Sequence, residues 1–284
     1  MNTATLSTKR FALPYLSSLP WTLVVGASIV AMSILVAIFA PFIAPYDPFE
    51  QVFTEVLQAP SMTHWFGTDN FGRDVFSRVL WGTRIDLLMG SVAVFIPFVI
   101  GTAIGTLAGY YGGWIDRILM RILDITMSFP FFVLVIAIVA ILGAGLISFF
   151  IAVSMVGWVS YARLVRAQFL VIKKQDFVMA AKCLGFSDIR IMARHILPNA
   201  IMPAIVFCMS DVIIDLLLGS SLSYLGLGVS PPTAEWGLMI AESQNYLAQA
   251  WWMTVFPGLA IVLLALGFSL LADGLADKLS VTET

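Results

Sequence analysis

Two aspartates in an otherwise apolar run are the residues best placed to do chemistry in this chain. Asp211 and Asp215 lie within the stretch 200–222. They share one side of a helix, because residues four apart are one turn from each other. A carboxylate at the centre of a bilayer costs about 2.5–3.5 kcal/mol on insertion scales, so it should face other helices or water. We predict that both line a path through the membrane; the alternative is a structural polar contact.

The chain around these aspartates is too apolar for a soluble protein. Of its 284 residues, 60% are hydrophobic and 11% charged, and the mean hydropathy is +0.96. Soluble domains carry about 25% charged residues, and about 20 apolar residues cross a bilayer. The sequence therefore predicts an all-α, polytopic membrane protein with about six spans. The predicted spans are 21–44, 85–108, 122–142, 146–161, 200–222 and 251–271.

The basic residues set the predicted orientation. Positively charged residues concentrate on the cytoplasmic side of membrane proteins. If the N-terminus is cytoplasmic, twelve basic residues fall inside and only Arg73, Arg78 and Arg84 fall outside. The twelve are Lys9, Arg10, Arg117, Arg121, Arg163, Arg166, Lys173, Lys174, Lys182, Arg190, Arg194 and Lys278. Both termini are then predicted to be cytoplasmic.

The remaining reactive side chains do not suggest an enzyme. His64 is predicted outside and His195 inside, so they cannot share a site. Cys183 and Cys208 have neither metal-ligand nor disulfide spacing, and the GSS at 219–221 has no histidine in a span to activate a serine. There is no G-x-x-x-x-G-K-[ST] phosphate loop. We expect no bound metal, no bound cofactor and no catalysis by this chain.

A charged island at about 176–198 is predicted to form a helical hairpin. The stretch 176–184 is typical of a short helix, and Gly185 stands where a left-handed residue commonly ends one. Ser187 is a good N-cap for a second helix, which Pro198 should end.

The hairpin should also have an apolar side. Ile189, Met192 and Ile196 would share one face of the second helix. A lone loop has no core in which to bury that face, so either the membrane surface or a partner protein must cover it. The small residues Ala180 and Ala181 near the elbow favour a protein groove, because close approach needs small side chains.

Several long motifs resemble one transporter family. AAKCLG followed by I…LPN, within 180–199, is similar to the cytoplasmic "EAA" loop of ATP-binding-cassette (ABC) importer permeases. FGTDNFGRDVFSRVLWGTR resembles the N-terminal signature of the C-type permeases for dipeptides, oligopeptides and nickel. SLSYLGLGVSPPTAEWG and FPGLAIVLLALGFSLLADGLADKL resemble its later signatures. The chain departs from the pattern at Met179, where the loop's first acidic residue is expected; Asp176 is the nearest acid.

The resemblance implies a fold, a location and partners. The fold would be that of a type I ABC importer permease in the bacterial inner membrane. A segment 1–84 would hold the first span and an outer loop, and 85–284 would form the permease core. The chain would pair with a second, related permease, two cytoplasmic ATPase subunits that hold ATP and Mg, and a periplasmic substrate-binding protein; the bilayer surrounds it, and no nucleic acid is involved. The residues expected to couple to the ATPase are Asp176, Ala180, Ala181, Lys182, Gly185, Phe186, Ser187 and Arg190.

The outer polar segments suggest two further elements. Gly67 and Gly72 interrupt any regular helix, and Asp69, Arg73 and Asp74 could form an ion-pair knot. This loop is either a docking or gating element or a structural lid. Exposed ion pairs contribute only about 0–1 kcal/mol, which favours the lid for the charges themselves.

The second outer element is PPTAEWG at 231–237. It is typical of a rigid turn followed by a tryptophan anchored at the membrane interface.

Two other functions fit parts of the sequence. An ion-coupled secondary transporter would use Asp211 or Asp215 to carry its ion. This interpretation assigns no function to the cytoplasmic hairpin, and such transporters often contain an internal repeat, which this sequence does not show. A membrane scaffold without transport is the third reading. The motifs do not choose among peptides, nickel chelates, opines and oligosaccharides as the solute.

Overall fold

The computed structural model describes residues 20–281, and the regular secondary structure in that range is helical apart from one isolated β-bridge in a loop. The long helices are α1 (Trp21–Ile43), α2 (Val75–Tyr111), α3 (Gly113–Met127), α4 (Phe131–Leu142), α5 (Leu146–Ile172), α9 (Met202–Tyr224) and α11 (Trp252–Val281). The short ones are η1 (Phe53–Glu55), α6 (Asp176–Cys183), α7 (Asp188–Arg190), the π-helix η2 (Ile191–Ile196), α8 (Leu197–Ala200), α10 (Trp236–Ser243) and η3 (Gln244–Tyr246).

Among the described residues, five helices are long and apolar enough to cross a membrane: α1, α2, α5, α9 and α11. The predicted span 122–142 corresponds to part of α3 together with α4, which are bent by 84° at a short break and count as a sixth span if taken together. Pro130 caps the start of α4. Proline has no N–H to donate and disfavours a helical conformation in the residue before it, here Phe129.

A stripe of small residues brings α2 and α5 together. Gly101, Gly105 and Gly109 recur every fourth residue along α2. A Cβ on Gly105 would lie 2.5 Å from the carbonyl oxygen of Ala162, and one on Gly109 would lie 2.5 Å from the Cβ of Phe169. Without side chains the two backbones approach closely, which is a common way to pack membrane helices.

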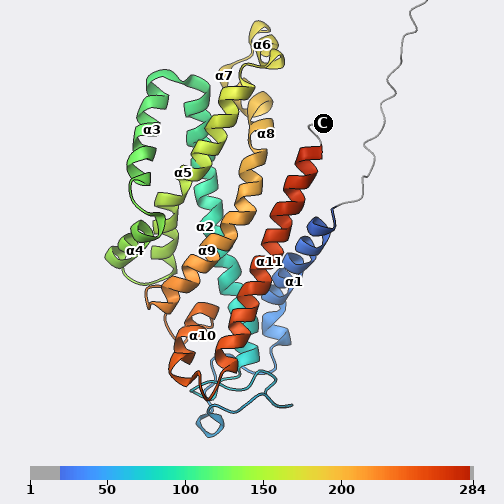
Figure 1. Ribbon diagram of the computed structural model, residues 1–284, viewed down its shortest axis with the longest axis vertical. Helices are drawn as coiled ribbons and strands as arrows, with labels where there is room; N and C mark the ends of the chain where they lie inside the picture. Colours follow the sequence, from blue (N-terminus) through green and yellow to red (C-terminus); the bar gives the residue numbers. More distant parts are fainter. Residues whose placement is uncertain (1–19, 282–284) are drawn as a thin grey trace, which may run out of the picture.

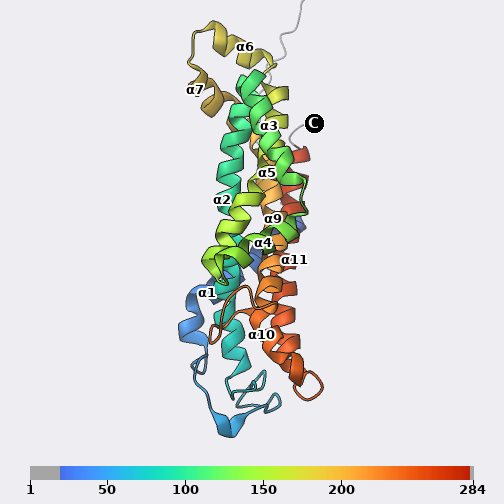
Figure 2. The same ribbon diagram turned by 90° about the vertical axis from the view of Figure 1, so that its left-hand side faces the viewer.

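The bundle is elongated, and its two ends carry different structures (Figure 1). The hairpin of α6 and α7 projects beyond the long helices at one end, as Figure 2 also shows. The loop between α1 and α2, together with α10, closes the opposite end. α1 and α11 pack side by side on one flank, and α3 and α4 lie on the other. The two polar elements predicted on opposite sides of the membrane thus lie at opposite ends of the molecule.

Candidate functional site

The elbow of the hairpin is built around Gly185. Its φ is +76°, and its N–H donates to the carbonyl of Lys182 at 3.0 Å. The N–H of Phe186 donates to the carbonyl of Ala181 at 3.2 Å. These two bonds form a Schellman motif, the arrangement in which a left-handed glycine ends a helix. The predicted end of the first helix is confirmed.

The second arm of the hairpin differs from the prediction. Ser187 precedes α7, but its hydroxyl makes no capping bond. The chain then continues as the π-helix η2, whose last bond runs from the N–H of Leu197 to the carbonyl of Met192. Pro198 does not end the helix; it lies in the first turn of α8. In a π-turn the backbone N–H bonds to the fifth preceding carbonyl and not to the fourth. The missing N–H of Pro198 is accommodated in this shifted pattern.

The apolar face of this arm is shifted for the same reason. Ile191, Met192 and Ile196 are buried, and they share one core with Val178 of α6 and with the long helices. Ile189, which the 3.6-residue period places on that face, is 73% exposed. The prediction of the face was wrong at Ile189, and the hairpin does bury an apolar side of its own.

The two small residues near the elbow have different surroundings. Ala181 is buried inside the hairpin, whereas Ala180 is exposed on its surface. The expectation that both alanines face a partner does not fit Ala181, which belongs to the same buried core as Val178 and Ile191. Only Ala180 is accessible for a close approach.

Contacts with α2 and within the hairpin occupy several of the predicted coupling residues. The Lys182 ammonium lies 5.4 Å from the centre of the Tyr110 ring, and the Tyr110 hydroxyl donates to Asp188. The Arg190 guanidinium lies 4.3 Å from the centre of the Phe186 ring. Cation–π contacts of this kind contribute about 0.5–1 kcal/mol at exposed sites. Lys182, Phe186 and Arg190 thus hold the hairpin in place.

The root of the hairpin is tied to the end of α2. The Lys173 ammonium donates to the carbonyl of Gly109 at 2.7 Å. Burial lowers the pKa of Lys173, and the nearby charge of Lys182 lowers it further. The two lysines therefore repel each other across the root while each binds a separate group of α2.

Four apolar side chains of the hairpin are exposed. Phe177, Met179, Leu184 and Ile189 are all exposed, Leu184 and Ile189 by 73% each. Asp176, in the first turn of α6, is exposed beside them. We call these four apolar residues the hairpin tip. Exposed apolar side chains on an otherwise charged element are suited to contact with another protein.

The two aspartates of α9 lie at a cavity of ≈ 300 Å³. Asp211 accepts a hydrogen bond of 2.6 Å from the Tyr161 hydroxyl of α5. Asp215 is only 1% exposed, and its Oδ2 has no hydrogen-bond partner. The structure thus brings the predicted pair together at one opening, with one carboxylate satisfied and the other not.

The other walls of this cavity come from α5 and from the break between α3 and α4. Phe129, Phe131 and Phe132 contribute from the break, Ser160 from α5 and Phe207 from α9. We call this space the acidic cavity. The 84° bend is what turns these aromatic residues towards α9.

At the opposite end, a buried ion cluster joins the outer loop to α10. Arg73 donates to Asp69 at 2.6 Å and to Glu242 of α10 at 2.8 Å. Arg78 donates to Glu242 at 3.2 Å and lies 3.6 Å from Asp69. The side chains of Arg73, Arg78 and Asp69 are at most 4% exposed. The prediction of an exposed ion pair was wrong, because α10 covers the cluster.

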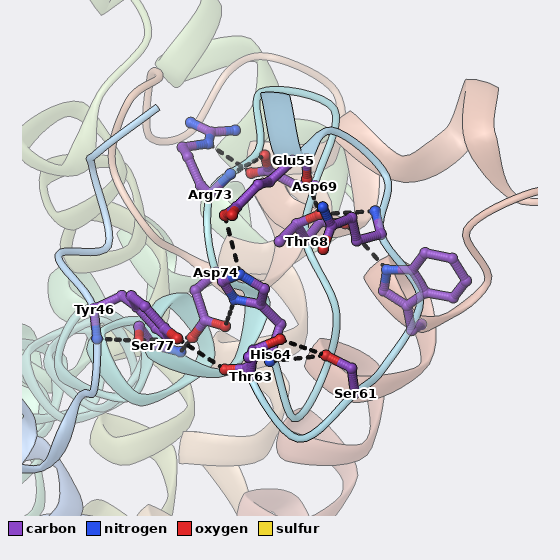
Figure 3. Close-up of polar contacts among 12 residues, drawn as sticks. Tyr46, Glu55, Ser61, Thr63, His64, Thr68, Asp69, Arg73, Asp74 and Ser77 are labelled. Atoms are coloured by element: carbon purple, nitrogen blue, oxygen red, sulfur yellow. Dashed lines mark hydrogen bonds and ion pairs between the residues drawn. The ribbon is translucent and has the colours of Figure 1, made fainter. Parts of the chain in front are cut away.

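Asp74 belongs to a second, separate group (Figure 3). Its Oδ1 lies 2.9 Å from Nδ1 of His64, and its Oδ2 accepts from the N–H of Ser77 at 2.7 Å, which caps α2. The other ring nitrogen of His64 lies 3.2 Å from Glu55. The predicted knot therefore holds for Asp69 and Arg73 but not for Asp74.

Both loop glycines adopt positive φ. Gly67 has φ +73° and Gly72 has φ +74°. A Cβ on Gly72 would overlap the carbonyl of Val52. The indole N–H of Trp252 donates to the carbonyl of Thr68 at 3.1 Å, which ties the loop to α11. We call the loop 45–74 together with α10 the outer lid; its buried part includes Thr68, Asp69, Arg73 and Asp74, and much of 45–65 is exposed.

Trp236 is the centre of the lid and not a membrane anchor. It is 2% exposed, and its indole N–H donates to the carbonyl of Val79 at 3.0 Å. Glu235 caps α10 by accepting from the N–H groups of Gly237 and Leu238 at 2.7 Å each. Burial raises the pKa of Glu235. The predicted interfacial tryptophan is corrected to a buried one.

Sequence reasoning missed Glu242 and Tyr161 as partners of the charged residues it had selected. A signal for Glu242 existed: the segment 223–250 contains Glu235 and Glu242 but no lysine or arginine. A buried acid in such a segment that pairs with a cation must find that cation in another segment. Nothing comparable marks Tyr161.

Comparison with known proteins gives a family. Residues 101–281 match the family described as "Binding-protein-dependent transport system inner membrane component". Residues 22–60 match the "N-terminal TM domain of oligopeptide transport permease C". The chain belongs to this permease family. It is therefore a membrane permease of an ABC importer, and the secondary-transporter alternative is not supported.

Two curated relatives resemble the permease over most of its length. A dipeptide transport system permease protein, DppC, of Alkalihalophilus pseudofirmus is 43% identical over 90% of this chain and 84% of its own. A glutathione transport system permease protein, GsiD, of Escherichia coli O6:K15:H31 is 47% identical over 89% of this chain and 84% of its own.

One solved structure shares the fold of the permease. It comes from the MetNI methionine ABC transporter in inward-facing conformations. The TM-score is 0.56 at 20% identity, and the match covers 69% of this chain and 93% of that one. The predicted all-α ABC importer permease fold is confirmed.

Proposed function

We propose that this permease forms half of the translocation pathway of an importer for short peptides or chemically related small solutes. The two relatives above are named as permeases for dipeptide and for glutathione transport, and both of these solutes are small peptides. Nickel chelates, opines and oligosaccharides are the weaker candidates, since neither of these relatives carries such a name.

The observation that carries the proposal is the hairpin. It projects beyond the helical bundle, it is fixed to α2 by its own contacts, and its tip presents apolar side chains. Such an element is suited to transmit the motion of a partner to the helices that it joins. We infer that the hairpin binds one of two cytoplasmic ATPase subunits, which hold ATP and Mg.

The remaining partners follow from the same arrangement. A second, related permease would complete the pathway, and the acidic cavity with Asp211 and Asp215 would face it. A periplasmic substrate-binding protein would deliver solute at the outer lid. The chain would lie in the bacterial inner membrane with the hairpin in the cytoplasm, which places both termini there too. Lys9 and Arg10, two of the basic residues behind this orientation, lie outside the described residues.

Co-purification tests the ATPase contact. The complete transporter is expressed with a tagged ATPase subunit and either Leu184→Glu at the hairpin tip or Leu247→Glu. Leu247 is 53% exposed, and it belongs to the turn between α10 and α11 at the opposite end. A buried charge in an interface costs several kcal/mol, so Leu184→Glu should lose the ATPase and solute uptake. The Leu247 variant should retain both. Equal recovery of the ATPase with both variants contradicts docking at the tip.

Labelling tests the orientation. Met62 is 96% exposed in the outer lid, and Leu184 is exposed at the hairpin tip. Single cysteines at these positions, in a chain with Cys183→Ser and Cys208→Ala, are treated with a membrane-impermeant thiol reagent in intact spheroplasts. Only the thiol at position 62 should react. Labelling at position 184 alone would reverse the proposed topology.

A further inference from the structure

The acidic cavity contains a buried carboxylate, one oxygen of which has no hydrogen-bond partner among the described residues. Asp215 is 1% exposed and lines the cavity, yet its Oδ2 accepts no hydrogen bond. A buried acceptor left unsatisfied costs about 1–3 kcal/mol, and more when it is charged. The described residues that line this cavity include no lysine, arginine or histidine. The lining of this cavity is therefore acidic, and the guanidinium of Arg163 reaches only the Sδ of Met127 on its rim, at 2.9 Å, in the part of the chain that the structure describes.

We propose that the acidic cavity is a recognition site for a primary ammonium group on the transported solute. This inference rests on the proposed function, because it places the cavity on the translocation pathway. Asp215 would accept directly from the ammonium group. Asp211, already held by Tyr161 one helical turn away, would add a second negative charge. The Tyr161 bond fixes one carboxylate and leaves the other available to the solute.

The composition of the walls favours an organic ammonium over a metal ion. A calcium ion takes six to eight oxygen ligands, and the described residues contain no group of three or more His, Cys, Asp or Glu side chains that could hold a metal. The walls instead present Phe129, Phe131, Phe132 and Phe207. Aromatic faces attract organic cations, and the three donors of an ammonium group match two carboxylates and the hydroxyl of Ser160.

The size and the rim of the cavity agree with this ligand. At roughly 30 Å³ per water, a volume of ≈ 300 Å³ holds about ten water molecules, enough for an amino group with its first residue. Met127, Phe129 and Phe132 on the rim are each about half exposed, at 50%, 56% and 49%. The cavity is therefore open on the side of the α3–α4 break. A solute can enter there without unfolding the subunit.

Charge-selective labelling in the complete transporter tests the proposal. Ser160→Cys places a thiol on the wall, in a background with Cys183→Ser and Cys208→Ala. Three methanethiosulfonates of similar size are compared, carrying an ammonium, a hydroxyl and a sulfonate group. An ammonium site should make the ammonium reagent react faster than the hydroxyl reagent by about tenfold beyond their ratio with a free thiol. Asp215→Asn should abolish this preference, and Asp124→Asn, at an exposed acid of α3, should not.

Competition identifies the kind of cation. Ethylammonium chloride should slow labelling, while sodium chloride at the same ionic strength should not. Equal protection by sodium overturns the ammonium assignment. If Asp215→Asn does not assemble, Asp211→Asn, which can still accept from Tyr161, should lower the preference instead. Absence of any preference for the ammonium reagent overturns the proposal.

Dipeptide uptake by the same preparations separates this inference from the proposed function. Loss of uptake together with loss of the charge preference in Asp215→Asn supports the ammonium site. Normal uptake in that variant overturns it and leaves the proposed function intact. If the unsubstituted transporter, supplied with its binding protein, takes up no dipeptide, the proposed solute class fails even where the charge preference is present.

Discussion

Removal of one carboxylate should loosen the whole outer lid. Glu242 accepts hydrogen bonds from both Arg73 and Arg78, whose side chains are 2% and 1% exposed. Glu242→Gln preserves the shape but removes the charge, so that two buried arginines share only Asp69. Breaking a buried ion pair on one side costs about 3–5 kcal/mol, because the remaining charge is left uncompensated. The glutamine oxygen can still accept a bond, so we expect the lower end, about 3 kcal/mol.

Hydrogen exchange measures this loss where it should occur. A tenfold change in an opening equilibrium corresponds to about 1.4 kcal/mol, so 3 kcal/mol should lower protection by about 150-fold. The affected amides should lie in the outer lid, within 52–74 and α10. The hairpin at the opposite end serves as the internal reference. Glu50→Gln, at an exposed acid of the same loop, should change protection by less than about twofold.

A double variant tests the charge argument itself. Arg73→Gln combined with Glu242→Gln leaves Arg78 facing Asp69 with balanced charge. The double variant should therefore lose at least about 1 kcal/mol less than the sum of the single variants. Strict additivity, or unchanged lid protection in Glu242→Gln alone, would refute the reasoning.

Three further outcomes are expected. Gly105→Ala places a methyl group 2.5 Å from a carbonyl of α5 and should destabilise by about 1–3 kcal/mol. Gly258→Ala, on α11 with open space around it, should not destabilise; equal unfolding temperatures for the two variants in detergent would contradict the close approach. Gly185→Val should cost about 1–2 kcal/mol at its positive φ and expose the hairpin to protease, whereas Gly185→Asn should resist cleavage. Burial raises the pKa of Glu235, so the folded state binds more protons than the unfolded state and lid protection should fall as pH rises from the ordinary carboxyl range through the raised pKa. Glu235→Gln should flatten that slope, and an unchanged slope would assign it to another group.

The spans were predictable because hydropathy alone determines which runs can cross a membrane. The sharp bend between α3 and α4 was not. Pro130 is the local signal, but Pro41, Pro97 and Pro257 lie inside helices that continue through them. In a membrane, neighbouring helices can satisfy the backbone groups that a proline leaves free. Whether a proline breaks a helix therefore depends on packing that the sequence does not state.

The functional residues were predictable where local spacing determines their position. The pair Asp211 and Asp215 follows from a four-residue interval, and Gly185 follows from the chemistry of helix ends. The sequence predicted the pair Asp69 and Arg73 of the ion cluster but not Glu242, because Glu242 lies 169 residues from Arg73. The exposed position of Ile189 could not be foreseen from a 3.6-residue period, because a π-turn interrupts that period.

That π-turn has a mechanical consequence. From Asp188 the chain runs through η2 and α8 into α9 with only Ile201 outside a helix, and α9 contains Asp215. The number of residues in the π-turn determines how the hairpin is rotated relative to α9, because each residue of an α-helix rotates the chain by about 100°. Shortening η2 by one residue would keep both ends folded but twist the hairpin by about a quarter of a revolution relative to the acidic cavity. A force applied at the hairpin would then act on a different side of α9.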